Sequence, residues 1–195
     1  MQVPLFPLNV VLFPGGPLPL RIFESRYIDM ISERMRSEGP FGVLLIREGT
    51  EAGGPASTYD IGTLARITDF YQGSDGLLGV TAIGEQRFRL LAAERAADGL
   101  NVGTIEILPD EPDVPLPAEY EPLADILAAV LDDLGKLYDS LPRQLDRAGW
   151  VANRFLEILP IRIEEKQALL DNDDPLGRLM LVREVLDRVR PAAGN

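Results

Sequence analysis

The sequence predicts an α+β protein in which a small antiparallel β-barrel with one helix is followed by a helical bundle. Three observations carry this prediction. Strand-like segments separated by turn signals fill the first half, a stretch rich in proline and acidic residues follows, and helical periodicity continues to the end. We place the barrel over residues 1–110, a linker over 111–118 and the bundle over 119–192.

The apolar opening, "VPLFPLNVVLFPGGPLPLRIFESRY", predicts folded strands rather than a signal peptide or a membrane anchor. No charge occurs between Val3 and Leu20, but the run lacks a basic leader and a small-residue cleavage site. Its prolines would leave backbone groups unpaired in lipid, whereas proline is tolerated in a strand at a sheet edge. We therefore expect a turn over residues 14–16, no membrane partner and a cytoplasmic protein.

The segment "FESRYIDMISERMRSEG" predicts the helix of the barrel half. Its apolar residues recur at helical spacing, Glu24 stands at the N-cap position, and Gly39-Pro40 ends the element. The next run, "FGVLLIRE", is short and apolar, which is typical of a buried strand. We therefore expect a helix and then a strand over residues 41–48.

Four more strand segments are expected after a loop over residues 49–57. Their sequences are "YDIGTLARITDFYQ", "LLGVTAIG", "QRFRLLAAERA" and "LNVGTIEIL". Turn signals at 74–76 and at 98–99 contain Asp-Gly, which indicates a hairpin when it stands between such runs. With the opening segment, the result is a meandering sheet of about six strands, and this pattern predicts a small barrel.

The second half is helical. The stretch "PDEPDVPLP" (109–117) is rich in proline and acid, must be extended, and is the linker candidate. Beyond it, an apolar stripe from Leu123 to Leu137 predicts one continuous helix. The remaining helices are one that ends at Pro160, one over residues 163–170, and one with Asp174 as N-cap and Pro175 at its first position.

Composition excludes several kinds of chemistry. The chain has no cysteine and no histidine, so disulfides, thiolate nucleophiles and Ser-His-Asp arrangements are excluded. A net charge of −12 disfavours nucleic acid, because phosphates are bound by basic surfaces. No phosphate-binding glycine motif occurs. We therefore expect no cofactor, no metal site and no enzymatic activity.

Two catalytic alternatives stay open on the residues alone. Ser140 lies one helical turn after Lys136, so the two side chains could form a Ser-Lys pair, although both are better read as the solvent face of a helix. A pair of carboxylates in a cleft could also act in acid/base chemistry. Asp171, Asp173 and Asp174 resemble a calcium loop only superficially, because the glycine and the distal glutamate of that motif are missing.

Taken together, the segments resemble the substrate-binding N-terminal domain of the Lon protease. The resemblance begins at "PLFPLNVVLFPGGPLPLRIFESRY", continues through "FGVLLI", "IGTLARI" and "DGLLGVTAIGEQRFRLL", and extends into "WVANRFLEILPIRIEEKQALLDNDDPLGRL". Each fragment alone is weak, but their common order along nearly the whole chain is specific.

The resemblance implies a PUA-like barrel followed by a helical bundle, and a role in recognising unfolded or tagged polypeptide for degradation. Lon itself continues into an ATPase module and a peptidase, whereas this sequence has no Walker motif, so it resembles the stand-alone versions of the domain. Cereblon also contains a domain of this kind. PUA-type barrels often bind RNA, which makes RNA a further alternative partner.

The leading hypothesis is a protein-binding module that acts as an adaptor or regulator in protein quality control. Its expected partner is a polypeptide, captured by strand addition or in apolar pockets. The expected contact residues lie in the opening strand and at the start of the first helix, where apolar surface meets one charge. They are Phe13, Pro14, Phe23, Arg26 and Tyr27.

Overall fold

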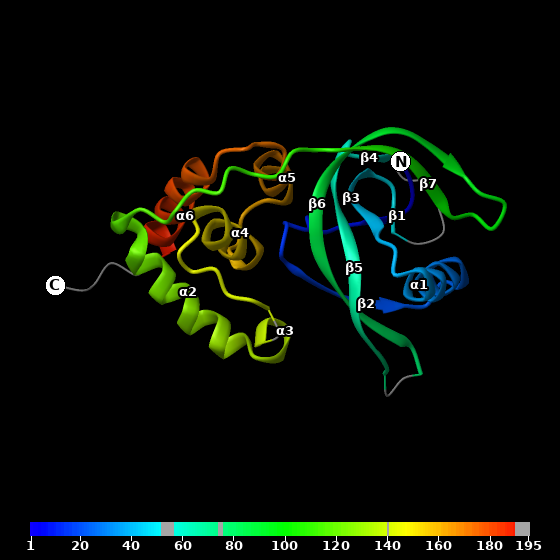
Figure 1. The fold of residues 1–195 in the computed structure, drawn as a ribbon, viewed down its shortest axis with the longest axis horizontal. Coiled ribbons are helices and arrows are strands. Elements are labelled where there is room, and N and C mark those ends of the chain that lie inside the picture. The colour runs from blue at the N-terminus through cyan, green and yellow to red at the C-terminus, as the bar shows by residue number, and fades with distance from the viewer. Residues whose placement is uncertain (52–56, 74–75, 140, 190–195) are drawn as a thin grey trace. The chain divides into compact units, whose positions relative to one another are not determined.

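The computed structural model describes residues 1–51, 57–73, 76–139 and 141–189. The chain forms two compact units, Met1–Asp110 and Glu111–Asn195. The first is built around a β-sheet and the second is helical, which confirms the predicted α+β class (Figure 1). Within the described residues, none of the helices combines the length and apolar character needed to span a bilayer.

The sheet of the first unit curls into a ring of five strands. β1 pairs with β7 in antiparallel orientation and with β3 in parallel orientation, and β5 and β6 complete the circuit β1-β7-β6-β5-β3. Closure removes most free sheet edges. In the described residues the strands are β1 Gln2–Leu8, β2 Pro17–Ile22, β3 Phe41–Glu48, β4 Ser57–Thr58, β5 Ile61–Gln72, β6 Leu78–Arg95 and β7 Asn101–Ile107.

One long strand, β6, replaces two of the expected segments. The sequence predicts a break near residues 84–86, but β6 runs unbroken for 18 residues. Along one edge it pairs first with β2 and then with β7, while β5 follows its other edge. Pairing on both sides supplies the hydrogen bonds that hold this strand together past Gly84.

Several strands bury side chains on both faces. Leu5 and Leu44 belong to one apolar cluster, whereas their neighbours Phe6 and Val43 belong to another. Because successive side chains of a strand point to opposite faces, β1 and β3 each lie between the two apolar clusters. This explains why "FGVLLI" in β3 is apolar throughout instead of alternating.

The second cluster lies under β2 and the helix α1 (Ser25–Ser37). Glu24 is the N-cap residue, as expected, and the buried face of α1 carries Tyr27, Met30 and Ile31. The helix ends at Ser37, and the C-cap residue Glu38 adopts a positive φ of 53°. A left-handed residue at this position is a common helix ending.

The second unit contains a short 3₁₀ helix and five α-helices in the described residues. α4 is the most deeply buried of these, and it packs against both α2 and α6. Asp174 caps α6 by accepting a hydrogen bond from the Gly177 amide at 2.9 Å, as the sequence predicts. The elements are η1 Ala118–Tyr120, α2 Glu121–Leu134, α3 Lys136–Asp139, α4 Ala148–Ile158, α5 Ile163–Asp171 and α6 Pro175–Val189.

The expected continuous helix from Leu123 to Leu137 is wrong, because α2 ends at Leu134. Gly135 follows with φ 64° and ψ −138°, a conformation open to glycine and incompatible with a continuing helix. Leu137 therefore lies in the separate short helix α3.

The segment expected as a linker is held by the second unit. The Leu116 amide donates to the Asp146 carbonyl at 2.8 Å, and the Ala148 amide donates to the Val114 carbonyl at 2.9 Å. Glu111 accepts a hydrogen bond from Arg178 of α6 at 2.7 Å. Hydrogen bonds of Glu111, Val114 and Leu116 therefore attach the stretch from 111 to 118 to the rest of the second unit.

Candidate functional site

The five residues expected to contact a partner lie in very different environments. Phe13 is fully buried, and Tyr27 is buried with its ring stacked 4.0 Å from that of Phe6. Burial raises the pKa of the Tyr27 hydroxyl above its ordinary value. Pro14 is half-buried, whereas Phe23 is 62% exposed. Of the three aromatic side chains, Phe23 alone offers apolar surface.

Arg26 holds the start of α1 in place. Its Nη2 lies 2.8 Å from the Glu24 carboxylate, its Nη1 donates to the Gly99 carbonyl at 2.9 Å, and its guanidinium lies 4.6 Å from the centre of the Tyr27 ring. These contacts tie the helix to the turn between β6 and β7. A role of Arg26 in contacting a partner stays a prediction.

Among the described residues, parts of several strand edges lie outside the paired parts of the sheet. β2 pairs with β6 on one side, β1 pairs with β3 only from Leu5 onward, and β5 pairs with β3 only through residues 63–65. Among the described residues, no strand pairs with 66–72 of β5 on the side away from β6. An open edge presents backbone donors and acceptors to another chain.

Prolines remove backbone N–H donors from two of these edges, those of β2 and β1. Pro17 and Pro19 of β2 pair with Ile83 and Thr81 of β6, and Pro4 of β1 pairs with Val102 of β7. Because proline has no N–H, its nitrogen must face away from the partner strand, toward the open side. Each proline therefore removes one donor from an outer edge. Residues 66–72 contain no proline.

A groove of about 450 Å³ runs beside the open edge of β5. Its walls are the C-terminal end of α1 and the strand itself, and its apolar lining comes from Met35, Ile67 and Phe70. Phe70 is 57% exposed although its ladder partner Val80 is buried. The volume falls within the range of about 300–1,000 Å³ that is usual for ligand pockets.

The charged rim of this groove is largely paired within the protein. Arg66 Nε lies 2.6 Å from the Glu85 carboxylate, and Arg34 Nε donates to Glu33 at 2.5 Å. Asp69 Oδ1 accepts a hydrogen bond from the amide of Phe70 at 2.8 Å. The rim therefore carries both signs of charge around an apolar floor.

Tyr71 adds a second exposed aromatic side chain on the opposite face of β5. Its ring covers Gly79, where an added Cβ would lie 2.3 Å from the ring, and the residue is 53% exposed. The expected contact set omitted both Phe70 and Tyr71. Two adjacent aromatic residues at a strand end must occupy both faces, and this pattern in "TDFYQ" was the available signal.

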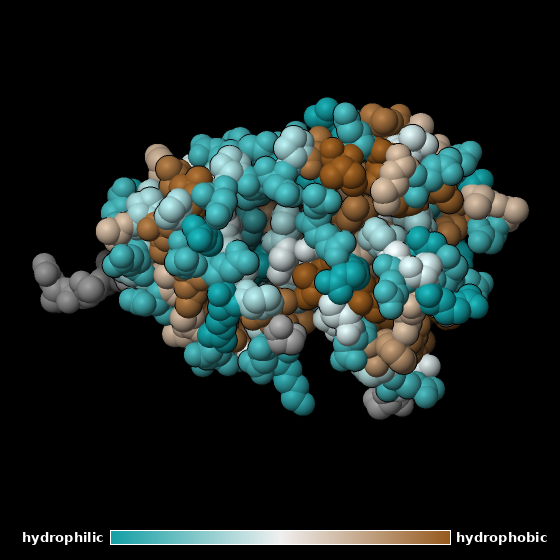
Figure 2. All heavy atoms as spheres, viewed as in Figure 1, coloured by the Kyte–Doolittle hydropathy of each residue, from teal (hydrophilic) through white to brown (hydrophobic). Residues whose placement is uncertain are grey.

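A larger groove of about 550 Å³ lies between α1, the start of β1 and the turn that joins β6 to β7. Its charged lining residues are Asp29, Glu33, Arg34, Arg36 and Asp98, three acidic and two basic, whereas the groove along β5 has two of each sign. The adjacent edge of β1 carries Pro4. Because proline has no N–H to donate, this edge suits strand addition less well than the edge of β5 does. On the face shown in Figure 2, hydrophobic residues emerge between hydrophilic ones over the strands of the first unit.

The second unit contains a buried cluster of ionisable side chains. The Glu157 carboxylate accepts a hydrogen bond from Arg154 Nη2 at 2.6 Å and one from the Tyr138 hydroxyl at 3.3 Å. Lys166 Nζ donates to the backbone carbonyl of Glu157 at 3.2 Å. Burial raises the pKa of Glu157 to about 7, although Arg154 acts in the opposite direction.

The structure gives little support to the two catalytic alternatives, the Ser-Lys pair and the pair of carboxylates. Lys136 is exposed in the short helix α3, while its proposed partner Ser140 lies outside the described residues. In the part of the chain that the structure describes, no three acidic side chains come together as a metal site would require. Of the three acidic residues at 171, 173 and 174, Asp174 caps α6.

Residues 2–188 match the family described as the ATP-dependent protease La (LON) substrate-binding domain. The chain belongs to this family. Lon protease 2 of Myxococcus xanthus is 30% identical to it over 195 residues, which cover 96% of this chain and 24% of that protein. Cereblon of Xenopus tropicalis is 31% identical over 113 residues, which cover 56% of this chain and 24% of that protein.

The LON substrate-binding fold is also found in the solved structures. The Lon N-terminal domain protein from Xanthomonas campestris matches with a TM-score of 0.74 and 35% identity, covering 94% of this chain and 98% of that one. The N-terminal domain of the Mycobacterium avium complex Lon protease matches with a TM-score of 0.64 and 16% identity. The chain spans about a quarter of the length of the curated relatives it matches.

Proposed function

We propose that this protein is a non-catalytic module that binds unfolded or tagged polypeptide and acts as an adaptor or regulator in protein quality control. The observation that carries the proposal is its membership of the LON substrate-binding domain family over residues 2–188. The absence of histidine and cysteine from the sequence agrees with a binding role rather than a hydrolytic one.

The surface of the first unit supports polypeptide as the partner. Exposed aromatic side chains at Phe23, Phe70 and Tyr71 offer apolar contact area, and the open edge of β5 offers backbone hydrogen bonds. Large exposed apolar side chains commonly mark interaction sites when they gather beside a groove. Strand addition and side-chain pockets are the usual ways in which sheet proteins bind extended chains.

Binding can be tested with a permanently unfolded probe, a fluorescent protein substrate whose cysteines have been reduced and carboxymethylated. We expect the full chain to raise its fluorescence anisotropy with micromolar affinity and to leave the native, disulfide-bonded form unaffected. Equal binding of both forms, or of neither, would contradict the proposal. Reactions with casein and fluorogenic peptides, with and without ATP and divalent metals, should show no turnover.

The regulatory role needs a second experiment with a Lon protease from the same cells. As an adaptor or regulator, the chain should change the rate at which that protease degrades an unfolded substrate, with a dependence on concentration that follows the measured substrate affinity. An unchanged degradation rate at saturating chain would contradict the adaptor role while leaving polypeptide binding intact.

A further inference from the structure

The backbone direction of β5 can be read from the prolines of β2. Since Pro17 and Pro19 cannot donate to β6, their partners Ile83 and Thr81 turn their backbone groups toward β5. Thr81 pairs with Asp69 of β5, so Asp69 bonds to β6. Backbone groups alternate in direction along a strand, and the next residue therefore turns its N–H and C=O to the open edge.

Two further contacts agree with this assignment. The Gly73 amide donates to the Leu77 carbonyl at 2.8 Å, which places residues 73, 71 and 69 in the set that bonds to β6. The Phe70 amide donates to the carboxylate of the neighbouring Asp69, which agrees with an amide turned away from β6. Phe70 and Gln72 therefore present their backbone groups to the open side of β5.

We propose that an extended segment of unfolded polypeptide binds as an added strand along β5, bonded to the backbone of Phe70 and Gln72. This inference rests on the proposed function and assigns it a place and a mode. The added strand would continue the line of β3, which occupies the same edge at residues 63–65. Where β3 begins, Gly39-Pro40 turns the chain away into α1 and leaves the edge open.

The groove selects the side chains of the added strand. Phe70, Ile67 and Met35 make its floor apolar, and side chains of an added strand point alternately into the groove and away from it. The segment should therefore carry apolar residues at every second position. Because the chain has a net charge of −12, the intervening positions favour neutral or basic residues over acidic ones.

Asp69 limits strand addition at the open edge of β5. Its carboxylate occupies the Phe70 amide, which is one of the donors that an added strand would use. An incoming carbonyl has to replace this contact, so Asp69 lowers the affinity of the edge for any chain. Charged side chains on open edges commonly limit unwanted strand pairing.

The test uses a fluorescein-labelled nine-residue peptide in which valine alternates with lysine, titrated with the full chain at two salt concentrations. Two derivatives carry N-methyl groups on the valine amides or on the lysine amides, and a third replaces valine with alanine. Strand addition predicts that only one methylated peptide retains binding, because one set of amides faces β5. The alanine peptide should bind about tenfold more weakly, as expected from lost burial.

Variants of the chain locate the site. Gln72→Pro removes an outward donor as the prolines do in β2, and Phe70→Ala removes the apolar floor. Each should weaken binding by about tenfold. Leu91→Ala is the matched control, because Leu91 is also an exposed apolar strand residue at 59% exposure but lies on β6. Circular dichroism and thermal unfolding confirm that each variant is folded.

Substitutions of Asp69 test whether its carboxylate lowers the affinity of the β5 edge for an added strand. Asp69→Ala should strengthen binding severalfold, while Asp69→Asn keeps an acceptor for the Phe70 amide and should strengthen it less. Affinity that falls in Asp69→Ala would contradict this role. If Asp69→Ala loses folding, Asp69→Asn tests this role, and the N-methyl comparison on the unchanged chain still tests strand addition.

The outcomes separate this inference from the proposed function. If the chain binds the unfolded protein probe but both methylated peptides bind like the parent, strand addition is wrong and polypeptide binding stands. If Leu91→Ala weakens binding as much as Phe70→Ala, the place is wrong. If neither the unfolded protein nor any peptide binds, the proposed function itself fails.

Discussion

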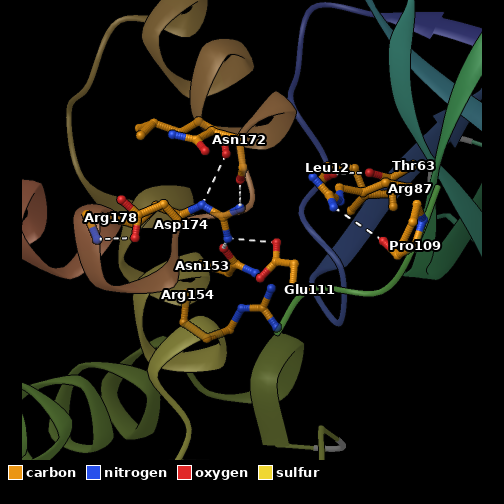
Figure 3. Close-up of polar contacts among 12 residues, drawn as sticks. Leu12, Thr63, Arg87, Pro109, Glu111, Asn153, Arg154, Asn172, Asp174 and Arg178 are labelled. Carbon is orange, nitrogen blue, oxygen red and sulfur yellow. Dashed lines mark hydrogen bonds and ion pairs between the residues drawn. The ribbon is translucent and has the colours of Figure 1, made fainter. Parts of the chain in front are cut away.

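At the scale of single residues, Thr63 is a buried polar residue that is satisfied by a long-range contact. Thr63 is 1% exposed, and its hydroxyl donates to the carbonyl of Leu12 at 2.5 Å (Figure 3). The bond fixes the loop after β1 to β5, 51 residues away in sequence. A buried carbonyl without its donor lowers the stability of the folded state, so the Thr63 hydroxyl contributes to folding stability through this bond.

Replacing Thr63 with valine should lower the free energy of unfolding by about 1–3 kcal/mol, because the Leu12 carbonyl loses its donor at nearly constant side-chain volume. Urea denaturation measures the change. Thr63→Ser keeps the hydroxyl and is the control, with a smaller loss. Equal stability of the valine variant and the wild type would show that the hydrogen bond contributes nothing.

Glu157 should make stability depend on pH. Its pKa is raised from 4.5 to about 7 by burial, so the folded state binds the proton more tightly than the unfolded state does. The stabilisation from this group is fully present below about pH 4.5 and is lost as pH rises through about 7, with a span of up to about 3 kcal/mol. Glu157→Gln removes this titration.

Urea denaturation of the wild type and of Glu157→Gln at pH 5 and pH 8 checks the sign. The wild type should lose stability relative to the variant at the higher pH. A difference between the two proteins that stays constant, or that moves the other way, would show that Arg154 keeps the carboxylate ionised.

At the scale of elements, one buried arginine joins four segments of the second unit. Arg178 of α6 is 1% exposed and donates to Asn153 of α4 at 2.9 Å, to the Leu169 carbonyl of α5 at 3.0 Å and to the Asn172 carbonyl. It also pairs with Glu111 at 2.7 Å (Figure 3). The planar guanidinium can serve several acceptors at once, which the ammonium of lysine cannot match in geometry.

Arg178→Ala should destabilise the chain by about 3–5 kcal/mol, because Glu111 and several carbonyls are left buried without their donor. Arg178→Lys keeps the charge but loses the fork, and should fall between the alanine variant and the wild type. Thermal unfolding followed by circular dichroism measures both. As a control, Arg188→Ala removes an exposed i,i+4 ion pair of the same helix and should cost less than about 1 kcal/mol.

At the scale of the whole molecule, the boundary between the units falls between Asp110 and Glu111. The sequence places the folded part of the second half from residue 119, but Glu111, Val114 and Leu116 already bond within the second unit. A fragment of 111–195 should therefore be more stable than one of 119–195. Thermal unfolding of the two fragments checks this, and equal melting temperatures would show that residues 111–118 do not stabilise the second unit.

Much of this organisation follows from the sequence. The helical and apolar periodicities predicted α1, α4, α5 and α6, and Asp174-Pro175 marked the start of α6, because caps and repeats act within a few residues. The absence of cysteine and histidine excludes disulfides, thiolate nucleophiles and histidine bases on composition alone. The order of the opening motifs indicated the family.

Long-range pairing was decided only in the tertiary structure. The unbroken β6, the closure of β1 on β3 and the burial of Arg178 depend on partners far along the chain, which no local pattern reveals. The same holds for the open edge of β5: the sequence shows prolines in β2, but their meaning for Phe70 appears only when β6 aligns both strands. The sequence determined the division into a strand-rich and a helical half, most of the helices and the family. The tertiary structure decided which backbone groups remain available to a partner, because hydrogen-bond direction is a property of paired strands.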